Sequence, residues 1–587
     1  MDRLRARLGP LWPYLVLIGL PTAIFLVPDL ADGKLLMAGD NVQQNYPLHV
    51  LVGDMLSHGQ LPFWNKYIFS GTPLLAGFNA GAFYPLIGLF AILPDRAAWI
   101  ATEAILFSSV GVGMYAFLRT LKLSTMACFL GAFTYTFGGT VFSQVNHVDM
   151  TEGFAALPWM LLAVHLILRD GKWRWSIVLG IGFATVIFGG APEAMLDEAI
   201  LVLAYAAISA WGDRQRWWRL VTRAGTGAGL ALSLAAIQWL PGLSAIANSQ
   251  RGGVGGSFAA AGSYPTDFGL FSLVPYLFGG YNNLGSSPFF GQYNLPEVEI
   301  YLGVLPIIAL VALLHPRWPS RLAGPERRTW YLVGLLGLLL ALGSNTPLEH
   351  LFNAIPLYGH QRLQSRNMID VSTAVCVLFA GWLDRRDEPQ PSFVRYERAV
   401  AFVPVGVVGA LMVWALASPS SLINAFSGGG SITAVHERSV RVTTLIALAF
   451  CVTAAAVVWL RSRVARGTWV RWAMVFVLAD VGLIAGSGQL LNVPNNAYLS
   501  GNSPIEQYLA ANLPPGGRFD VFDPQQYNSG YYTGLPDLNI LAGLPSVGGY
   551  ASIVNGNYST VTNTHTVGAL NVPELDSGNL DDLDLQE

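Results

Sequence analysis

Long apolar runs recur along the whole chain, and they constrain its fold more than any other feature. Only 12% of the 587 residues are charged, against about 25% in soluble domains. A helix needs about 20 mostly apolar residues to cross a bilayer. The sequence therefore predicts an all-α polytopic membrane protein, with about thirteen transmembrane helices near 11–28, 97–118, 124–143, 154–168, 174–190, 197–211, 224–245, 300–314, 330–343, 367–383, 399–418, 440–460 and 469–488.

The basic residues predict how these helices are oriented. With Arg3, Arg5 and Arg7 placed in the cytoplasm, 24 of the 33 lysines and arginines fall on the cytoplasmic side and nine on the other. Such a bias is the usual signature of orientation in short loops. We therefore expect a cytoplasmic N-terminus, an uncleaved first span and an extracytoplasmic C-terminus. The excess of arginine over lysine, with abundant Ala and Gly, is typical of a GC-rich bacterial genome. We therefore expect the protein in a bacterial cytoplasmic (inner) membrane.

All the long hydrophilic segments then lie outside the cell. Residues 29–82 form the first outer loop of a transmembrane domain that spans 1–489. Strand-like pieces divided by Gly, Pro and Asn predict a small extracytoplasmic α/β or β-rich module at 490–572. The acidic end, 573–587, is predicted to be disordered. No basic tract indicates nucleic acid, and no nucleotide-binding, zinc or serine-hydrolase motif stands out.

The stretch "GDNVQQNYP" opens the first outer loop and holds one acid, Asp40, among amides. It shows no helical periodicity. Beyond it, apolar residues recur at helical spacing from Leu48 to Leu56, which predicts a helix lying along the membrane surface. Gly59, Pro62, Gly71 and Pro73 then predict turns.

Acids also occur beside the ends of later spans. "NHVDMTEG" holds His147, Asp149 and Glu152, and "GGAPEAMLDE" holds Glu193. Acids near the hydrocarbon edge are costly unless they are hydrated, paired or functional. Each alone reads most simply as a solvated loop acid, but together they suggest one polar cavity that opens outward. Arg362 and Arg366 are four residues apart, so they would bind a phosphate jointly or anchor a helix end in the interface.

The first outer loop resembles the YfhO-like family of bacterial membrane proteins. The likeness rests on "GDNVQQNYP" followed by "GQLPFWNKYIFSGTPLLAGFNAGAFYPL", and more loosely on "SRNMIDVSTAVCVLFAGW" and "GGYASI". That family is similar to GT-C glycosyltransferases. The resemblance implies a polyprenyl-phosphate sugar donor, Asp40 as the catalytic base, Asp149 or Glu152 as a second acid, and Arg366 or Arg362 at the donor phosphate. Some enzymes of this class have two adjacent acids at this place. Here Asn41 follows Asp40, so the second acid is missing.

This reading predicts an inverting hexosyl or pentosyl transfer to an extracytoplasmic cell-envelope glycan or glycolipid. A base must then take the proton of the acceptor hydroxyl. The acids would suit Mg²⁺ or Mn²⁺ as a cofactor. The sequence does not fix how many of them would bind the metal. Two other classes stay open: a lipid or glycan transporter or flippase, and a scaffold that presents the tail. The predicted lining of the cavity comprises Gln43, Gln44, Tyr46, Trp64, Asn65, His147 and Glu193.

Overall fold

The computed structural model confirms that the predicted spans are helical. It describes residues 11–250, 262–280, 287–291, 293–315, 318–348, 350–351, 354, 363–385, 391–426, 431–483, 498–520, 537–562 and 567–568. Each predicted range overlaps a helix or a broken pair of helices, and the end of the last one, 484–488, lies outside the described residues. These are α2 (Trp12–Asp32), α4 (Asp95–Thr120), α5 (Thr125–Phe137) with α6 (Gly139–Phe142), α8 (Leu157–Asp170), α9 (Arg174–Phe188), α10 (Pro192–Ala210), α12 (Gly225–Leu234) with α13 (Ala236–Ala247), α16 (Val304–Ala312), α17 (Gly324–Leu342), α19 (Met368–Leu383), α20 (Pro391–Ala417), α22 (Ala434–Leu460) and α23 (Arg466–Val477) with η9 (Leu478–Leu483).

Not all of these helices are long and apolar enough to cross a membrane alone. Within the described residues five qualify by length and composition, over Trp12–Asp32, Asp95–Thr120, Val148–Asp170, Pro391–Ala417 and Ala434–Leu460. Two bent pairs, Thr125–Phe137 with Gly139–Asn146 and Arg214–Leu234 with Ala236–Ala247, would raise the number to seven. The polytopic all-α class is confirmed, and these criteria give fewer spans than the thirteen expected because several of the helices are short or bent.

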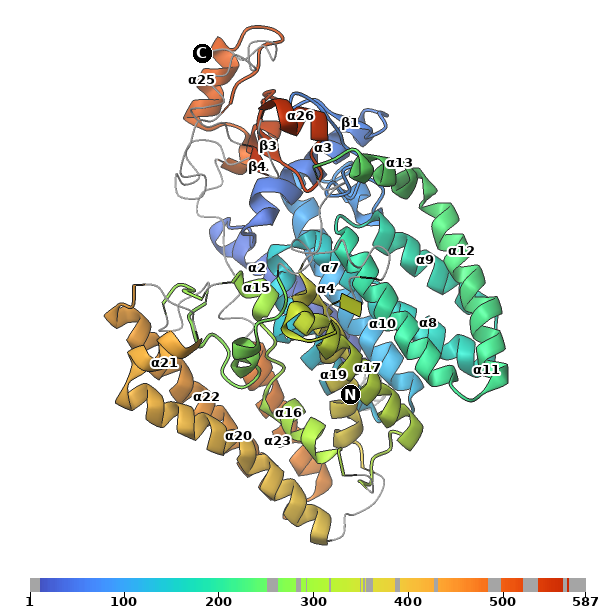
Figure 1. Ribbon diagram of the computed structural model, residues 1–587, viewed down its shortest axis with the longest axis vertical. Helices are drawn as coiled ribbons and strands as arrows, with labels where there is room; N and C mark the ends of the chain where they lie inside the picture. The colour runs from blue at the N-terminus through green and yellow to red at the C-terminus, as the bar shows by residue number, and fades with distance from the viewer. Residues whose placement is uncertain are drawn as a thin grey trace, which may run out of the picture.

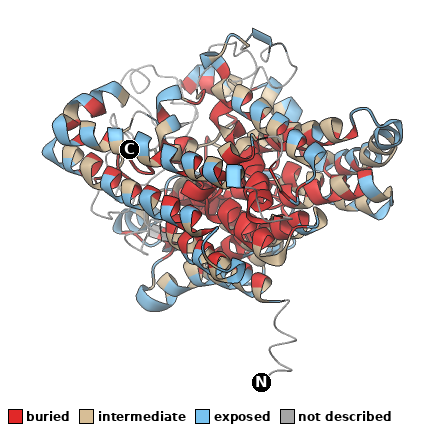
Figure 2. Ribbon diagram, turned by 90° about the horizontal axis from the view of Figure 1, so that it is seen from below, coloured by how far each residue is buried: buried red, intermediate tan, exposed pale blue. Residues whose placement is uncertain are grey.

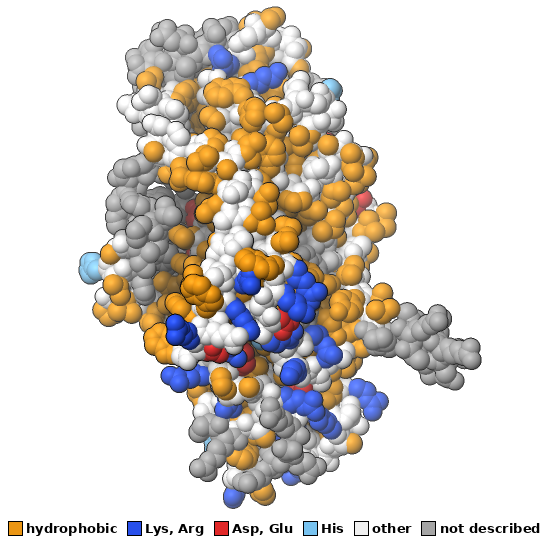
Figure 3. Space-filling model, turned by 90° about the vertical axis from the view of Figure 1, so that its right-hand side faces the viewer, with side chains coloured by type: hydrophobic (Ala, Val, Ile, Leu, Met, Phe, Trp, Pro, Cys, Tyr) orange, Lys and Arg blue, Asp and Glu red, His pale blue; other side chains and the backbone are white. Residues whose placement is uncertain are grey.

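The core lies where α4, α5, α8 and α19 meet. Nearly every residue of α5 and α19 is buried, and Figure 2 shows this buried centre beneath more exposed outer helices. α20 and α22 pack as a pair at one side, and α9 packs on α12 at the other (Figure 1). Apolar side chains cover much of the outer face in Figure 3, as expected of a surface in contact with lipid.

The first outer loop is more ordered than its sequence predicts. Asn41–Asn45 form a π-helical turn, η1, which runs directly into α3 (Tyr46–Ser57). The helix was predicted, but its apolar residues Leu48 and Val52 are buried and α3 packs against η2 (Pro85–Leu89). That face is therefore covered by protein, which differs from the expected helix lying on the membrane.

A short hairpin follows in the family-like stretch. β1 (Trp64–Asn65) pairs antiparallel with β2 (Thr72–Pro73). Gly71 lies close beneath Trp64 with a φ of 116°, where an added Cβ would come within 2.8 Å of the indole ring. The glycine of this motif is thus needed for both its backbone angle and its contact.

The C-terminal segment docks on this first outer loop. Its described elements are the helices α25 (Pro504–Asn512) and α26 (Gly556–Thr562), the short turns η10 (Tyr498–Ser500) and η12 (Leu538–Ile540), and the two-stranded pair β3 (Gly549–Tyr550) and β4 (Val567–Gly568). Backbone hydrogen bonds join Ser70 N to Ser546 O at 3.0 Å, Ser546 N to Tyr67 O at 2.9 Å and Phe69 N to Gly548 O at 3.0 Å. The predicted disordered tail, 573–587, lies outside the described residues.

Candidate functional site

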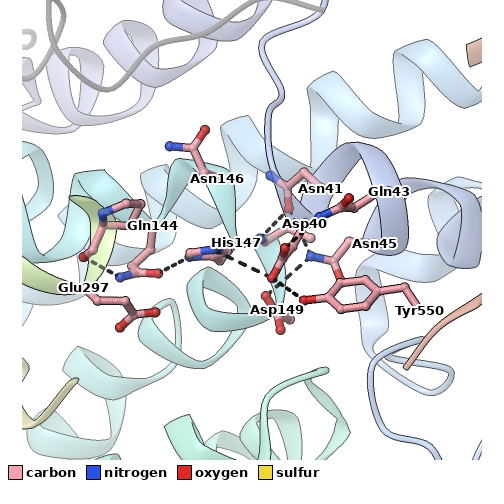
Figure 4. A network of polar contacts seen from close by, with 12 residues as sticks. Asp40, Asn41, Gln43, Asn45, Gln144, Asn146, His147, Asp149, Glu297 and Tyr550 are labelled. Carbon is pink, nitrogen blue, oxygen red and sulfur yellow. Dashed lines mark hydrogen bonds and ion pairs between the residues drawn. The ribbon is translucent and has the colours of Figure 1, made fainter. Parts of the chain in front are cut away.

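Asp40 lies at the start of η1, where three polar side chains approach its carboxylate (Figure 4). The Tyr550 hydroxyl donates to Oδ2 at 3.3 Å, and Gln43 Nε2 donates to Oδ1 at 3.3 Å. His147 Nε2 lies 3.8 Å from Oδ2, and the Asp40 side chain is 34% exposed. The carboxylate is therefore oriented by its neighbours and still open to a ligand.

Asn41 explains why an amide follows the acid. Its side chain is fully buried. Nδ2 donates to Val145 O at 2.9 Å, and Oδ1 accepts from Val148 N at 2.8 Å and from Asn45 Nδ2 at 3.0 Å. A carboxylate cannot donate to Val145, so this position requires an amide. Asn41 fastens the first outer loop to the loop that carries His147 and Asp149.

His147 is held in one orientation by a chain of hydrogen bonds. Gln144 Nε2 donates to Pro296 O at 3.0 Å, which leaves Gln144 Oε1 to accept from His147 Nδ1 at 2.8 Å. The ring proton of neutral His147 is therefore on Nδ1, an assignment that follows from the hydrogen-bond network. Nε2 then faces Asp40 and is a proton acceptor.

Two further acids were predicted near Asp40, and the structure places them differently. Asp149, in α7 (Val148–Phe154), accepts from Asn45 Nδ2 at 3.4 Å and so belongs to the same polar network as Asp40. Glu152 is fully buried, and its Oε2 accepts from Gly190 N at 3.1 Å. Glu152 thereby joins its own helix to the loop before α10, whereas Asp149 shares the polar network of Asp40.

Arg366 already binds a carboxylate. Its Nη2 donates to Glu297 Oε1 at 2.7 Å and its Nε to Oε2 at 3.1 Å, with both side chains largely buried. Burial alone lowers the pKa of Arg366, but Glu297, then Glu193 and Asp149, outweigh this effect and raise that pKa. A phosphate at Arg366 would have to share the guanidinium with Glu297. Arg362 lies outside the described residues.

The other predicted lining residues divide into two groups. Gln43 contacts Asp40, and Gln44 Nε2 donates to Tyr550 O at 3.1 Å, so both lie at the site. Tyr46 is buried and packs edge-on against Trp99. Asn65 accepts from Tyr67 N at 2.9 Å, and Trp64 covers Gly71, so these two shape the hairpin. Glu193 lies in the first turn of α10, close enough to Arg366 to affect its pKa.

Sequence reasoning missed Tyr550 and Gln144. Tyr550 lies 510 residues from Asp40 in the chain. The one available signal was the stretch "GGYASI", which was matched to the family without a role. Gln144 precedes "NHVDMTEG" by two residues, and only its contact with His147 reveals its part.

The divalent metal suggested by the acids stays a prediction. Within the described ranges, no group of three or more His, Cys, Asp or Glu side chains is arranged to hold a metal ion. Asp40 and Asp149 are instead linked through amides and His147.

The comparisons with known proteins add little to this geometry. No protein-family model matches the chain, and no curated protein matches it. Among solved structures, ArnT from Cupriavidus metallidurans bound to undecaprenyl phosphate aligns with a TM-score of 0.46 and 12% identity, over 91% of this chain and 89% of that chain. At this TM-score and identity we draw neither a fold assignment nor a residue role from the match.

Proposed function

We propose that the protein is an integral-membrane glycosyltransferase that moves a sugar from a polyprenyl-phosphate donor to an extracytoplasmic glycan or lipid. The observation that supports this most is the state of Asp40, a partly exposed carboxylate held by Tyr550 and Gln43 with the imidazole of His147 beside it. The resemblance of the first outer loop to the YfhO-like family supports the same reaction class. The proposal also takes the N-terminus as cytoplasmic and the C-terminus as extracytoplasmic.

Asp40 acts as the general base in this proposal. Its carboxylate takes the proton of the acceptor hydroxyl while the acceptor oxygen forms a bond to the anomeric carbon. The bond from that carbon to the phosphate oxygen breaks, and the lipid phosphate leaves. Attack from the face opposite the phosphate inverts the configuration.

The neighbouring residues orient the carboxylate of Asp40 and later accept its proton. Tyr550 donates a hydrogen bond to one carboxylate oxygen of Asp40 and Gln43 donates to the other, which fixes the plane of the carboxylate. His147 Nε2 is placed to accept the proton from Asp40 once transfer is complete. Arg366 has the charge to stabilise the leaving phosphate, in competition with Glu297.

The first prediction concerns Asp40 itself. Asp40→Asn keeps the shape of the side chain but removes the base, so we expect transfer to fall at least about 100-fold. Asp54→Asn is the matched control, because Asp54 is an exposed acid in α3 of the same loop and pairs with His58. Transfer from a polyprenyl-phosphate sugar is measured with purified protein in lipid. Full activity of folded Asp40→Asn protein would contradict the role of Asp40.

Buried acids inside the helical bundle support transport as a second candidate. Glu103 in α4, Glu198 in α10 and Asp370 in α19 are almost fully buried, and within the described part of the chain both carboxylate oxygens of each have no hydrogen-bond partner. Acids at such depth are typical of proton or substrate pathways. Movement of a glycolipid across liposomes that Glu198→Gln abolishes and Asp40→Asn leaves intact would favour this candidate.

A further inference from the structure

A second polar site lies at the other end of the helical bundle from Asp40. α4 begins beside the first outer loop, where Arg96 forms an ion pair with Asp29, and its 26 residues carry the chain about 39 Å to Thr120. There a cavity of about 600 Å³ opens between the ends of α4, α8 and α10 and the start of α17. This site shares no residue with the one around Asp40.

Positive charge dominates this cavity. Among the residues that the structure describes, its lining includes four cations, Lys122, Arg169, Arg216 and Arg321, and one carboxylate, Glu326. Figure 3 shows lysine and arginine side chains gathered in this lower part of the molecule, below a largely apolar surface. The arrangement is that expected for an anion site at the edge of a hydrocarbon layer.

Three of these cations also pair with nearby carboxylates. Arg169 pairs with Asp170 at 2.7 Å, Arg216 with Asp213 at 3.3 Å and Arg321 with Asp384 at 3.6 Å, and each of these arginine side chains is roughly half exposed. The Arg216–Asp213 pair is exposed at both side chains, so it is weak and opens readily. Asp170 holds Arg169 by two hydrogen bonds, and Asp384 is fully buried and also pairs with Arg466, so a ligand would share Arg169 and Arg321 with these carboxylates. Among the described residues, Lys122 forms no ion pair.

The inner wall combines polar donors with apolar side chains. Tyr205 is fully buried, hydrogen-bonds to His165 Nδ1 at 2.7 Å and stacks on Trp330. Where Tyr205 donates to Nδ1, the Nε2 atom of His165 carries the ring proton and is a donor for a ligand; in the other tautomer Nδ1 donates to Tyr205 and Nε2 is an acceptor. Leu121, Leu168 and Leu322 complete the wall. An anion with an attached apolar part suits this combination.

We propose that this cavity binds a phosphate-bearing anion through Lys122, Arg169, Arg216 and Arg321. Guanidinium groups match the geometry of phosphate oxygens, and the ammonium of Lys122 adds a point charge. The phosphate belongs either to an anionic lipid headgroup or to a soluble phosphate compound. The site is independent of glycosyl transfer, so its test does not depend on the function of Asp40.

The test compares two substitutions on one short helix. Arg214 and Arg216 both lie in α11 (Arg214–Arg219), but only Arg216 lines the cavity. Full-length protein is placed in nanodiscs of phosphatidylglycerol and phosphatidylcholine, and retained lipid is counted by native mass spectrometry. Inorganic phosphate and pyrophosphate are titrated into the detergent-solubilised protein. Melting temperatures establish that each variant is folded.

We expect Arg216→Gln and Lys122→Gln each to weaken binding about tenfold, Lys122→Arg to retain it and Arg214→Gln to leave it unchanged. Preferential loss of phosphatidylglycerol would identify a lipid as the ligand. Binding of pyrophosphate without lipid, lost in the same variants, would identify a soluble phosphate. Equal effects of Arg214→Gln and Arg216→Gln, or no binding of any probe, would overturn the proposal.

Discussion

At the scale of the residue, Asn41 shows why a single amide is required beside the proposed base. Replacement by Asp removes the donor to Val145 O and adds a buried charge next to Asp40. We expect Asn41→Asp to lower the free energy of unfolding by about 3 kcal/mol, measured by denaturant titration in mixed micelles. Asn502→Asp, an exposed change near α25, is the control and should be nearly neutral. Unchanged stability of Asn41→Asp would show that a second acid is tolerated there.

At the scale of the element, α3 carries a buried histidine that makes the stability of the fold depend on pH. His49 is fully buried between Phe90 and Trp99, and within the described residues neither ring nitrogen has a hydrogen-bond partner. Burial lowers the pKa of His49 to about 3 from an ordinary value of 6.5. The unfolded chain therefore takes up a proton below pH 6.5 that the folded chain does not, so stability is complete above pH 6.5 and falls as the pH drops toward 3.

We therefore expect His49→Phe to be less sensitive to acid than the natural protein. The natural chain should lose about 2 kcal/mol at this position between pH 6.5 and pH 5, and the variant should lose none of it. Thermal unfolding at several pH values measures the difference. His58→Phe is the matched control, because His58 is exposed at the end of the same helix. If both variants follow the acid dependence of the natural protein, His49 titrates normally.

The helices were predictable because apolar periodicity is local. α3 was expected from the spacing of Leu48, Leu51 and Val52, and the structure confirms it. What covers its apolar face was not predictable, because a buried face and a membrane-facing one have the same composition. The π-helical turn at Asn41–Asn45 was missed for a related reason: its amides are buried by contacts with a distant loop, not by their own pattern.

At the scale of the whole molecule, the candidate site is assembled from segments far apart in the sequence. Asp40 was identified through a local motif, and Asp149 and His147 through acids beside a span. Glu297 carries no local signal, and the family-like stretch around Tyr550 does not give its role, since both roles arise only when the C-terminal segment and the middle loops meet the rest of the site. The predicted boundary at residue 490 therefore separates two parts of one site.

Docking of the C-terminal segment should thus control activity, and Gly549 offers a way to test this. A Cβ at Gly549 would lie 2.7 Å from the Cβ of Ile68, so Gly549→Val forces β3 away from the first outer loop and takes Tyr550 from Asp40. We expect at least a tenfold loss of transfer, as is typical when a positioned side chain is displaced, with faster proteolysis confined to the C-terminal segment. Ala510→Val, on an exposed position of α25, is the control. Unaltered transfer together with a released segment would mean that Asp40 works without Tyr550, and the site would then be complete within the transmembrane domain.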